Sequence, residues 1–179
     1  MLENLGTFTE YEIQLFNKNI ENKILKKNEV IISEGEISKS IFFIKNGATY
    51  QFQKIESEEK IIELNIQNDW IYNCDSLTNQ VPSKTTIKSF LQTEIIEVKL
   101  ETLHNLISIS QNFLQINKVF NSLNTRIHFY NNNLSPSEKY IYLLENRPEI
   151  IKIFPLNMIA SYLKIRQETL SRVRANLIF

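Results

Sequence analysis

Hydrophobic and polar residues follow three successive patterns along the chain. Ile13, Phe16 and Ile20 recur at helical spacing among polar residues, which predicts a short amphipathic helix with Thr9 as its N-cap. The pattern then changes to short runs rich in Ile, Phe, Val and Thr, separated by turn-forming residues: Val30–Ile32, Ile41–Ile44, Thr49–Gln53, Ile61–Ile66, Thr86–Phe90 and Glu94–Val98. Regularly spaced runs of this kind predict an antiparallel sandwich or jelly roll.

A third pattern begins at Ile109, where apolar residues recur with alternating gaps of four and three up to Leu134. A sustained repeat of about 3.5 residues is typical of a seam between two helices. We therefore expect a long helix over 109–134 that joins two copies of the chain through Ile109, Phe113, Ile116, Phe120, Leu123 and Ile127. The alternative is that this helix packs on its own domain, as Leu114, Val119 and Phe129 outside the seam suggest.

The remaining segment, 135–179, reads as three short helices. Ser135-Pro136 begins the first and Arg147-Pro148 ends it, and Pro155-Leu156 begins the second. The second and third helices have the pattern of a helix-turn-helix pair: a small residue, Ala160, at their crossing, and apolar residues at the junction, namely Ile159, Leu163, Ile165, Leu170 and Val173. The fold class predicted from all three patterns is α+β, with an antiparallel β-roll over 1–108, a dimerisation helix over 109–134 and a helix-turn-helix over 135–179.

The polar residues of the last helix are types that read DNA. Arg bonds guanine, Gln pairs with adenine and Glu accepts from cytosine. We expect Gln167, Glu168, Ser171 and Arg172 to face the major groove, with Arg174 and Lys164 nearer the phosphates. The chain has no net charge, but 135–179 holds seven Lys or Arg against four acidic residues, so the basic character is local. A helical hairpin used only for packing is the alternative.

These residues resemble those of the Crp/Fnr-type transcription regulators, most closely the short form found in Bacteroidetes-like bacteria. The resemblance covers nearly the whole chain and is most specific in Ile159–Leu163 followed by Glu168–Arg172; weaker matches are Lys26–Val30, Glu34–Glu36, Ile41–Gly47 and Gln80–Lys84. It implies a cyclic-nucleotide-binding β-roll, a long dimerising helix and a C-terminal helix that binds double-stranded DNA.

The chain departs from the family at the residues that would hold a cyclic nucleotide. Members that bind one carry Gly-Glu-Leu and, about ten residues on, Arg-Ser or Arg-Thr. The matching stretch here contains Tyr72, Asn73, Cys74, Ser83 and Lys84. A bulky tyrosine and a point-charge lysine do not reproduce a close backbone approach and a bidentate guanidinium. We expect a degenerate pocket that does not bind cyclic AMP and whose small-molecule effector, if any, is unknown.

Two further departures lie in the reading unit. Lys164 stands where the family has a turn glycine, so either Lys164 is left-handed or the turn differs. We also expect the β-hairpin wing of full-length members to be absent, because few residues follow Leu177, and this lowers the DNA affinity we expect. A β-roll sensor or interaction protein that has lost DNA binding is therefore the alternative function.

Enzymatic and metal chemistry are disfavoured because Cys74 is the only cysteine and His104 and His128 are the only histidines. We expect Cys74 to be a small buried residue, both histidines to lie near the surface, and no cofactor to be needed. The first residues show no export signal, and no apolar run is long enough to span a membrane. These features predict a cytoplasmic protein without a membrane partner.

Overall fold

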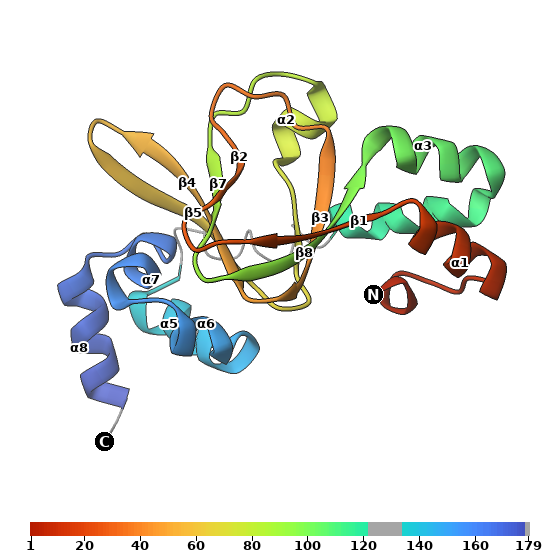
Figure 1. The fold of residues 1–179 in the computed structure, drawn as a ribbon. Coiled ribbons are helices and arrows are strands. Elements are labelled where there is room, and N and C mark those ends of the chain that lie inside the picture. The colour runs from red at the N-terminus through yellow and green to blue at the C-terminus, as the bar shows by residue number, and fades with distance from the viewer. Residues whose placement is uncertain (122–133, 178–179) are drawn as a thin grey trace.

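The computed structural model describes residues 1–121 and 134–177 and consists of a β-roll between two groups of helices (Figure 1). One sheet has the strand order β1-β8-β3-β6 and the other the order β2-β7-β4-β5, and every pairing is antiparallel. The strands are β1 (Glu21–Leu25), β2 (Val30–Ile32), β3 (Ser40–Asn46), β4 (Ala48–Ile55), β5 (Glu58–Ile66), β6 (Trp70–Ile71), β7 (Thr86–Ser89) and β8 (Thr93–Lys99). The six predicted runs all coincide with strands, whereas β1 and β6 were not predicted.

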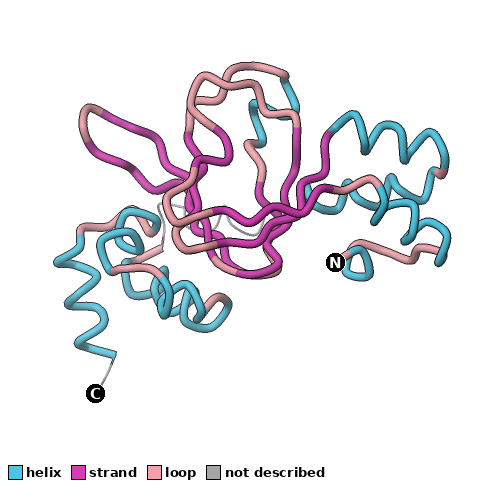
Figure 2. The backbone as a smooth tube through the Cα atoms, viewed as in Figure 1, coloured by secondary structure: helices cyan, strands magenta, loops and turns pink. Residues whose placement is uncertain are grey.

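Helices lie on both sides of the roll, as Figure 2 shows by colour. On the N-terminal side are the 3-10 turn η1 (Leu2–Asn4), α1 (Glu10–Lys18), α3 (Leu100–Ile109), the 3-10 helix η2 (Gln111–Asn117) and α4 (Lys118–Asn121). The short α2 (Cys74–Asn79) lies within the roll, and α5 (Pro136–Asn146), α6 (Pro148–Ile153), α7 (Leu156–Tyr162) and α8 (Gln167–Leu177) form the other side. Thr9 caps α1 and Ser135 caps α5, each through a capping box. The structure adds α6 to the three helices predicted after residue 134.

The predicted helix over 109–134 does not start as expected. Ile109 is the last residue of α3, and Ser110 is extended, with φ −144° and ψ 125°. The cause is a polar contact: Ser110 Oγ donates to Glu12 Oε1 at 2.5 Å and accepts from the backbone N–H of Asn112. A single helix over 109–134 is therefore wrong at its start, whereas the dimer interface stays a prediction.

Phe113 and Ile116 from that repeat are fully buried within their own chain. They belong to a core that covers one face of the β1-β8-β3-β6 sheet with residues of α1, α3, η2 and α4, including Phe16, Leu106 and Val119. A partner chain cannot reach them in this arrangement, so the alternative reading, packing on the own domain, holds for this stretch.

The helices α5 to α8 are not separated from the roll. Tyr50, Phe52, Ile61 and Leu64 of β4 and β5 share one apolar core with buried residues of these helices, namely Tyr140, Leu143, Ile150, Phe154, Ile159, Ala160, Tyr162, Leu163, Leu170 and Val173. The roll and helices α5 to α8 are thus joined by a continuous apolar interior, which the sequence pattern did not predict.

Gly47 forms the turn between β3 and β4. Its φ is +100°, and a Cβ at this position would lie 2.6 Å from Thr93 Oγ1 and 2.7 Å from the carbonyl oxygen of Gln92. Both the left-handed backbone and the close approach require glycine.

Candidate nucleic-acid interface and effector pocket

The turn between α7 and α8 is a Schellman motif. The N–H of Ile165 donates to the carbonyl of Ala160 at 3.0 Å, and that of Lys164 donates to the carbonyl of Ser161 at 3.1 Å. Lys164 has the left-handed backbone conformation that this motif requires, with a φ of 55°. Of the two possibilities for this position, the left-handed lysine is therefore the one adopted, at a cost of roughly 1–2 kcal/mol for a residue with a Cβ.

The apolar junction of the helix pair agrees with the prediction. Ile159, Ala160, Leu163, Leu170 and Val173 are all less than 9% exposed, and Ile165 packs against them half-buried. Because Ala160 has only a methyl group, the two helices can approach closely where they cross.

The predicted reading residues lie on the outer side of this junction. Gln167, Glu168, Ser171 and Arg172 are exposed on α8, as is Lys164 in the turn, whereas Arg174 is half-buried. Arg172 Nε donates to the carbonyl oxygen of Glu168 at 3.4 Å, one turn earlier. The first two turns of α8 therefore present four polar side chains on one exposed surface.

Sequence reasoning missed Lys139, which supports the same turn from α5. Its side chain is buried, and Nζ donates to the carbonyl oxygen of Leu163 at 3.2 Å. A cation at the C-terminal end of α7 is favourable because the last carbonyls of a helix carry partial negative charge. The available signal was spacing, since Lys139 lies four residues before the buried Leu143 and so shares its helix face.

The stretch that matches the cyclic-nucleotide cassette forms a closed network of neutral groups. Asn73 caps α2 by accepting from the N–H of Ser76 at 3.0 Å, and its Nδ2 donates to Ser83 Oγ at 2.7 Å and to Thr85 Oγ1 at 2.8 Å. Gln51 of β4 donates to the same Thr85 hydroxyl at 2.7 Å. Asn73, at the family's Glu position, and Ser83, one of the two candidates with Lys84 for the Arg position, are thus bonded to each other.

The other predicted pocket residues lie apart from this network. Tyr72 is buried with its ring edge-on to Phe120 at 5.0 Å, and its hydroxyl donates to the carbonyl of Val119 at 3.4 Å. Lys84 is exposed. Cys74 is exposed as well, which corrects the expectation that it is buried, because it stands at the first position of α2 and its side chain is directed to solvent.

The remaining candidates for the dimer seam are dispersed. Ile109 is 58% exposed at the end of α3, and Phe120 is half-buried beside Tyr72. Leu123 and Ile127 lie outside the described residues. The interface remains a prediction.

Within 1–121 and 134–177, no three His, Cys, Asp or Glu side chains gather as a metal site would require. His104 is exposed on α3, and His128 lies outside the described residues. None of the helices in these ranges is long and apolar enough to cross a membrane.

Glu12 is the described carboxylate with the most strongly shifted pKa. It accepts from Ser110, from the backbone and side chain of Thr9, and from Asn112. These hydrogen bonds, that of Ser110 first, lower the pKa of Glu12 to about 2 because they favour the charged form. Glu12 lies in α1, on the opposite side of the roll from α8 (Figure 1), and its hydrogen bonds join α1 to the segment after α3.

No family model and no curated protein matches the chain by sequence, but solved structures resemble it. FixK2 from Bradyrhizobium japonicum superposes with a TM-score of 0.70 at 15% identity over 88% of this chain and 84% of its own. A cyclic nucleotide-binding domain containing protein from Listeria monocytogenes gives 0.66 at 21% identity over 99% and 88%. The catabolite activator protein of Thermus thermophilus gives 0.59 at 14% identity over 97% and 85%. The chain has the fold of these proteins.

Proposed function

We propose that this protein is a homodimeric transcription regulator of Crp/Fnr type that reads DNA with α8. The observation that carries the proposal is the geometry of the α7–α8 pair: a tight left-handed turn, a buried crossing at Ala160 and four exposed polar residues on the first turns of α8. A recognition helix presents this end to base edges. The similarity to FixK2 and to the catabolite activator protein supports the same function.

The β-roll of this regulator is proposed not to bind cyclic AMP. Asn73, Ser83 and Thr85 carry no charge, and their hydrogen-bonding groups are already used by one another. The one cation of the cassette, Lys84, is exposed to solvent. A ligand would have to break that network before binding. Calorimetric titration with cyclic AMP is expected to show no saturable heat, and micromolar saturable binding would contradict the proposal.

The test of DNA reading is a selection from genomic fragments with the purified protein, followed by affinity measurements at low and moderate salt. Arg172→Ala should cost roughly 1–3 kcal/mol of binding and relax the preference at one base pair. Arg174→Ala should weaken all sequences alike and reduce the salt dependence. The matched control is Lys152→Ala, which removes an exposed cation on α6. It should change neither the DNA sequences selected nor the salt dependence of the affinity.

An interaction protein that no longer binds DNA is the second candidate. The zero net charge of the chain favours it, because nucleic-acid binding draws on a basic surface. If Arg172→Ala and Arg174→Ala both leave the selected sequences and the affinity unchanged, α8 is not the reader and this second function takes precedence.

A further inference from the structure

Lys139 is a cation buried among the helices α5 to α8. It lies in the first turn of α5 and is 7% exposed. An ammonium group has three N–H donors, and the carbonyl oxygen of Leu163, at 3.2 Å, is the one acceptor that Lys139 has among the described residues. None of the salt bridges in the described part of the chain includes Lys139.

A buried cation without a counter-charge lowers the stability of a fold, because the ion gives up its hydration and gains little attraction in return. The surroundings of Lys139 are apolar, since Tyr140, Leu143, Leu163 and Leu170 all belong to the buried core of these helices. A methionine would fill a similar volume without the cost of burying a charge. A residue that breaks the packing rule in this way is expected where function determines the side chain.

The acceptor of this bond is a carbonyl that the turn between α7 and α8 leaves without a backbone partner. The two hydrogen bonds of the turn use the carbonyls of Ala160 and Ser161, and no backbone N–H of the described residues donates to Leu163. Leu163 is the C-cap of α7 and is 0% exposed. Lys139 therefore supplies a donor where the last carbonyl of a buried helix end needs one.

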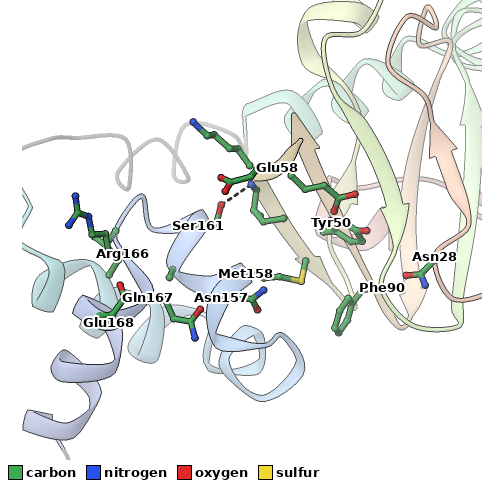
Figure 3. A pocket seen from close by; sticks show the side chains of 15 residues that line it. Asn28, Tyr50, Glu58, Phe90, Asn157, Met158, Ser161, Arg166, Gln167 and Glu168 are labelled. Carbon is green, nitrogen blue, oxygen red and sulfur yellow. Dashed lines mark hydrogen bonds between the residues drawn. The ribbon is translucent and has the colours of Figure 1, made fainter. Parts of the chain in front are cut away.

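The same bond links the third side of a triangle of helices. Both α5 and α7 pack against α8, and Lys139 joins α5 directly to the end of α7. Figure 3 shows Ser161 near this end of α7, with Gln167 and Glu168 just beyond the turn, where α8 begins. Lys139 thus helps to fix the direction in which α8 leaves the turn.

We propose that Lys139 is a positioning residue for DNA reading, which holds α8 at the angle its base contacts need without touching DNA itself. This inference rests on the proposed function. A functional site has to be held within about 0.5 Å and 10–20° of its productive geometry. Phosphate contacts carry no sequence information directly, so the contribution of Lys139 should appear in the specificity of binding.

The first experiment measures affinity by fluorescence anisotropy for a duplex from the genomic selection and for a scrambled duplex, at several salt concentrations. Lys139→Met should weaken binding to the selected duplex roughly five- to a hundredfold, the range of one good base contact. Binding to the scrambled duplex should stay within about twofold of the matched control, Lys152→Met, which removes the same charge from an exposed lysine. Because Lys139 contacts no phosphate in this proposal, both variants should show the same salt dependence.

The second set of measurements separates positioning from a general loss of structure. Lys139→Arg keeps a cationic donor and should bind the selected duplex within about threefold of the wild type. Lys139→Met should melt within about 4 °C of the wild type, because the lost hydrogen bond and the removed buried charge act in opposite directions. Hydrogen exchange at the Ile165 amide, which donates to Ala160 in the turn, should nevertheless accelerate about tenfold, whereas exchange in β3 and β8 should not change.

The outcomes distinguish the two proposals. If the wild type prefers the selected duplex and Lys139→Met binds it as tightly as Lys152→Met does, the positioning role is overturned and DNA reading stands. The positioning role is equally overturned if Lys139→Met weakens both duplexes alike, if it melts more than about 4 °C below the wild type, or if Lys139→Arg binds no better than Lys139→Met. Absence of DNA binding by the wild type rejects the proposed function, and the positioning role with it.

Discussion

Leu64→Ala tests whether the roll and the reading unit are one cooperative structure. Leu64 lies on β5, is 0% exposed and belongs to the core shared with α5 to α8. Truncating a fully buried leucine typically costs 2–5 kcal/mol. For a chain of this length, about 2–4 °C of melting temperature is lost per kcal/mol, so a fall of roughly 4–20 °C is expected.

The decisive measurement is native-state hydrogen exchange at the amide of Leu170, a fully buried residue in the first turn of α8 whose N–H donates to the carbonyl of Arg166 at 3.1 Å. If α8 opens only when the shared core opens, a loss of 2 kcal/mol raises the exchange rate about 30-fold. Leu91→Ala, at a leucine that is 38% exposed, is the control and should stay within about 0.5 kcal/mol. Unchanged exchange at Leu170 in Leu64→Ala would refute the reasoning and restore a reader that folds independently of the roll.

Three further changes test individual contacts. Because the pKa of Glu12 is lowered from 4.5 to about 2, the charged carboxylate stabilises the fold fully above pH 4.5, and this stabilisation is lost as the pH falls toward 2. In urea unfolding at several pH values, Glu12→Gln should therefore lose less stability on acidification than the wild type does. Lys164→Gly relieves the left-handed backbone and should raise the free energy of unfolding by up to about 1 kcal/mol, whereas a decrease would show that the lysine side chain contributes more than the strain costs. Gly47→Ala should destabilise by at least about 1 kcal/mol in thermal unfolding, and no loss would mean that the turn can rearrange.

Much of the fold was predictable because the relevant signals are local. Short runs rich in Ile, Phe, Val and Thr between turn-forming residues predicted six strands at the right places, and Thr9 and Ser135 predicted two helix starts. The helix pair was found for the same reason: Ala160, its apolar neighbours and Pro155 lie within a few turns of one another. The left-handed conformation of Lys164 was among the alternatives because turn geometry depends mainly on adjacent residues.

The features that were missed depend on partners distant in sequence. A periodic apolar pattern indicates that residues are buried, but it does not identify the surface that covers them. The pattern of Phe113 and Ile116 was therefore compatible both with a dimer seam and with a core inside one chain. The contact that ends α3 joins Ser110 to Glu12, about a hundred positions earlier. Lys139 was missed for a similar reason. A lysine is normally expected at the surface, and its contact with the carbonyl of Leu163 joins residues 24 positions apart.

The position of β5 connects the cassette to the reader. As the edge strand of its sheet, β5 exposes backbone groups that must be covered, and α7 covers one of them through Ser161. On its other side, β5 pairs with β4, where Gln51 is the cross-strand partner of Glu63 and bonds to Thr85 of the cassette network. A continuous set of hydrogen bonds and strand pairs therefore runs from Asn73 to Tyr162. A ligand that opened the cassette network would therefore act on the pairing partner of the strand to which α7 is bonded, and in the proposed regulator this is a route from the β-roll to α8.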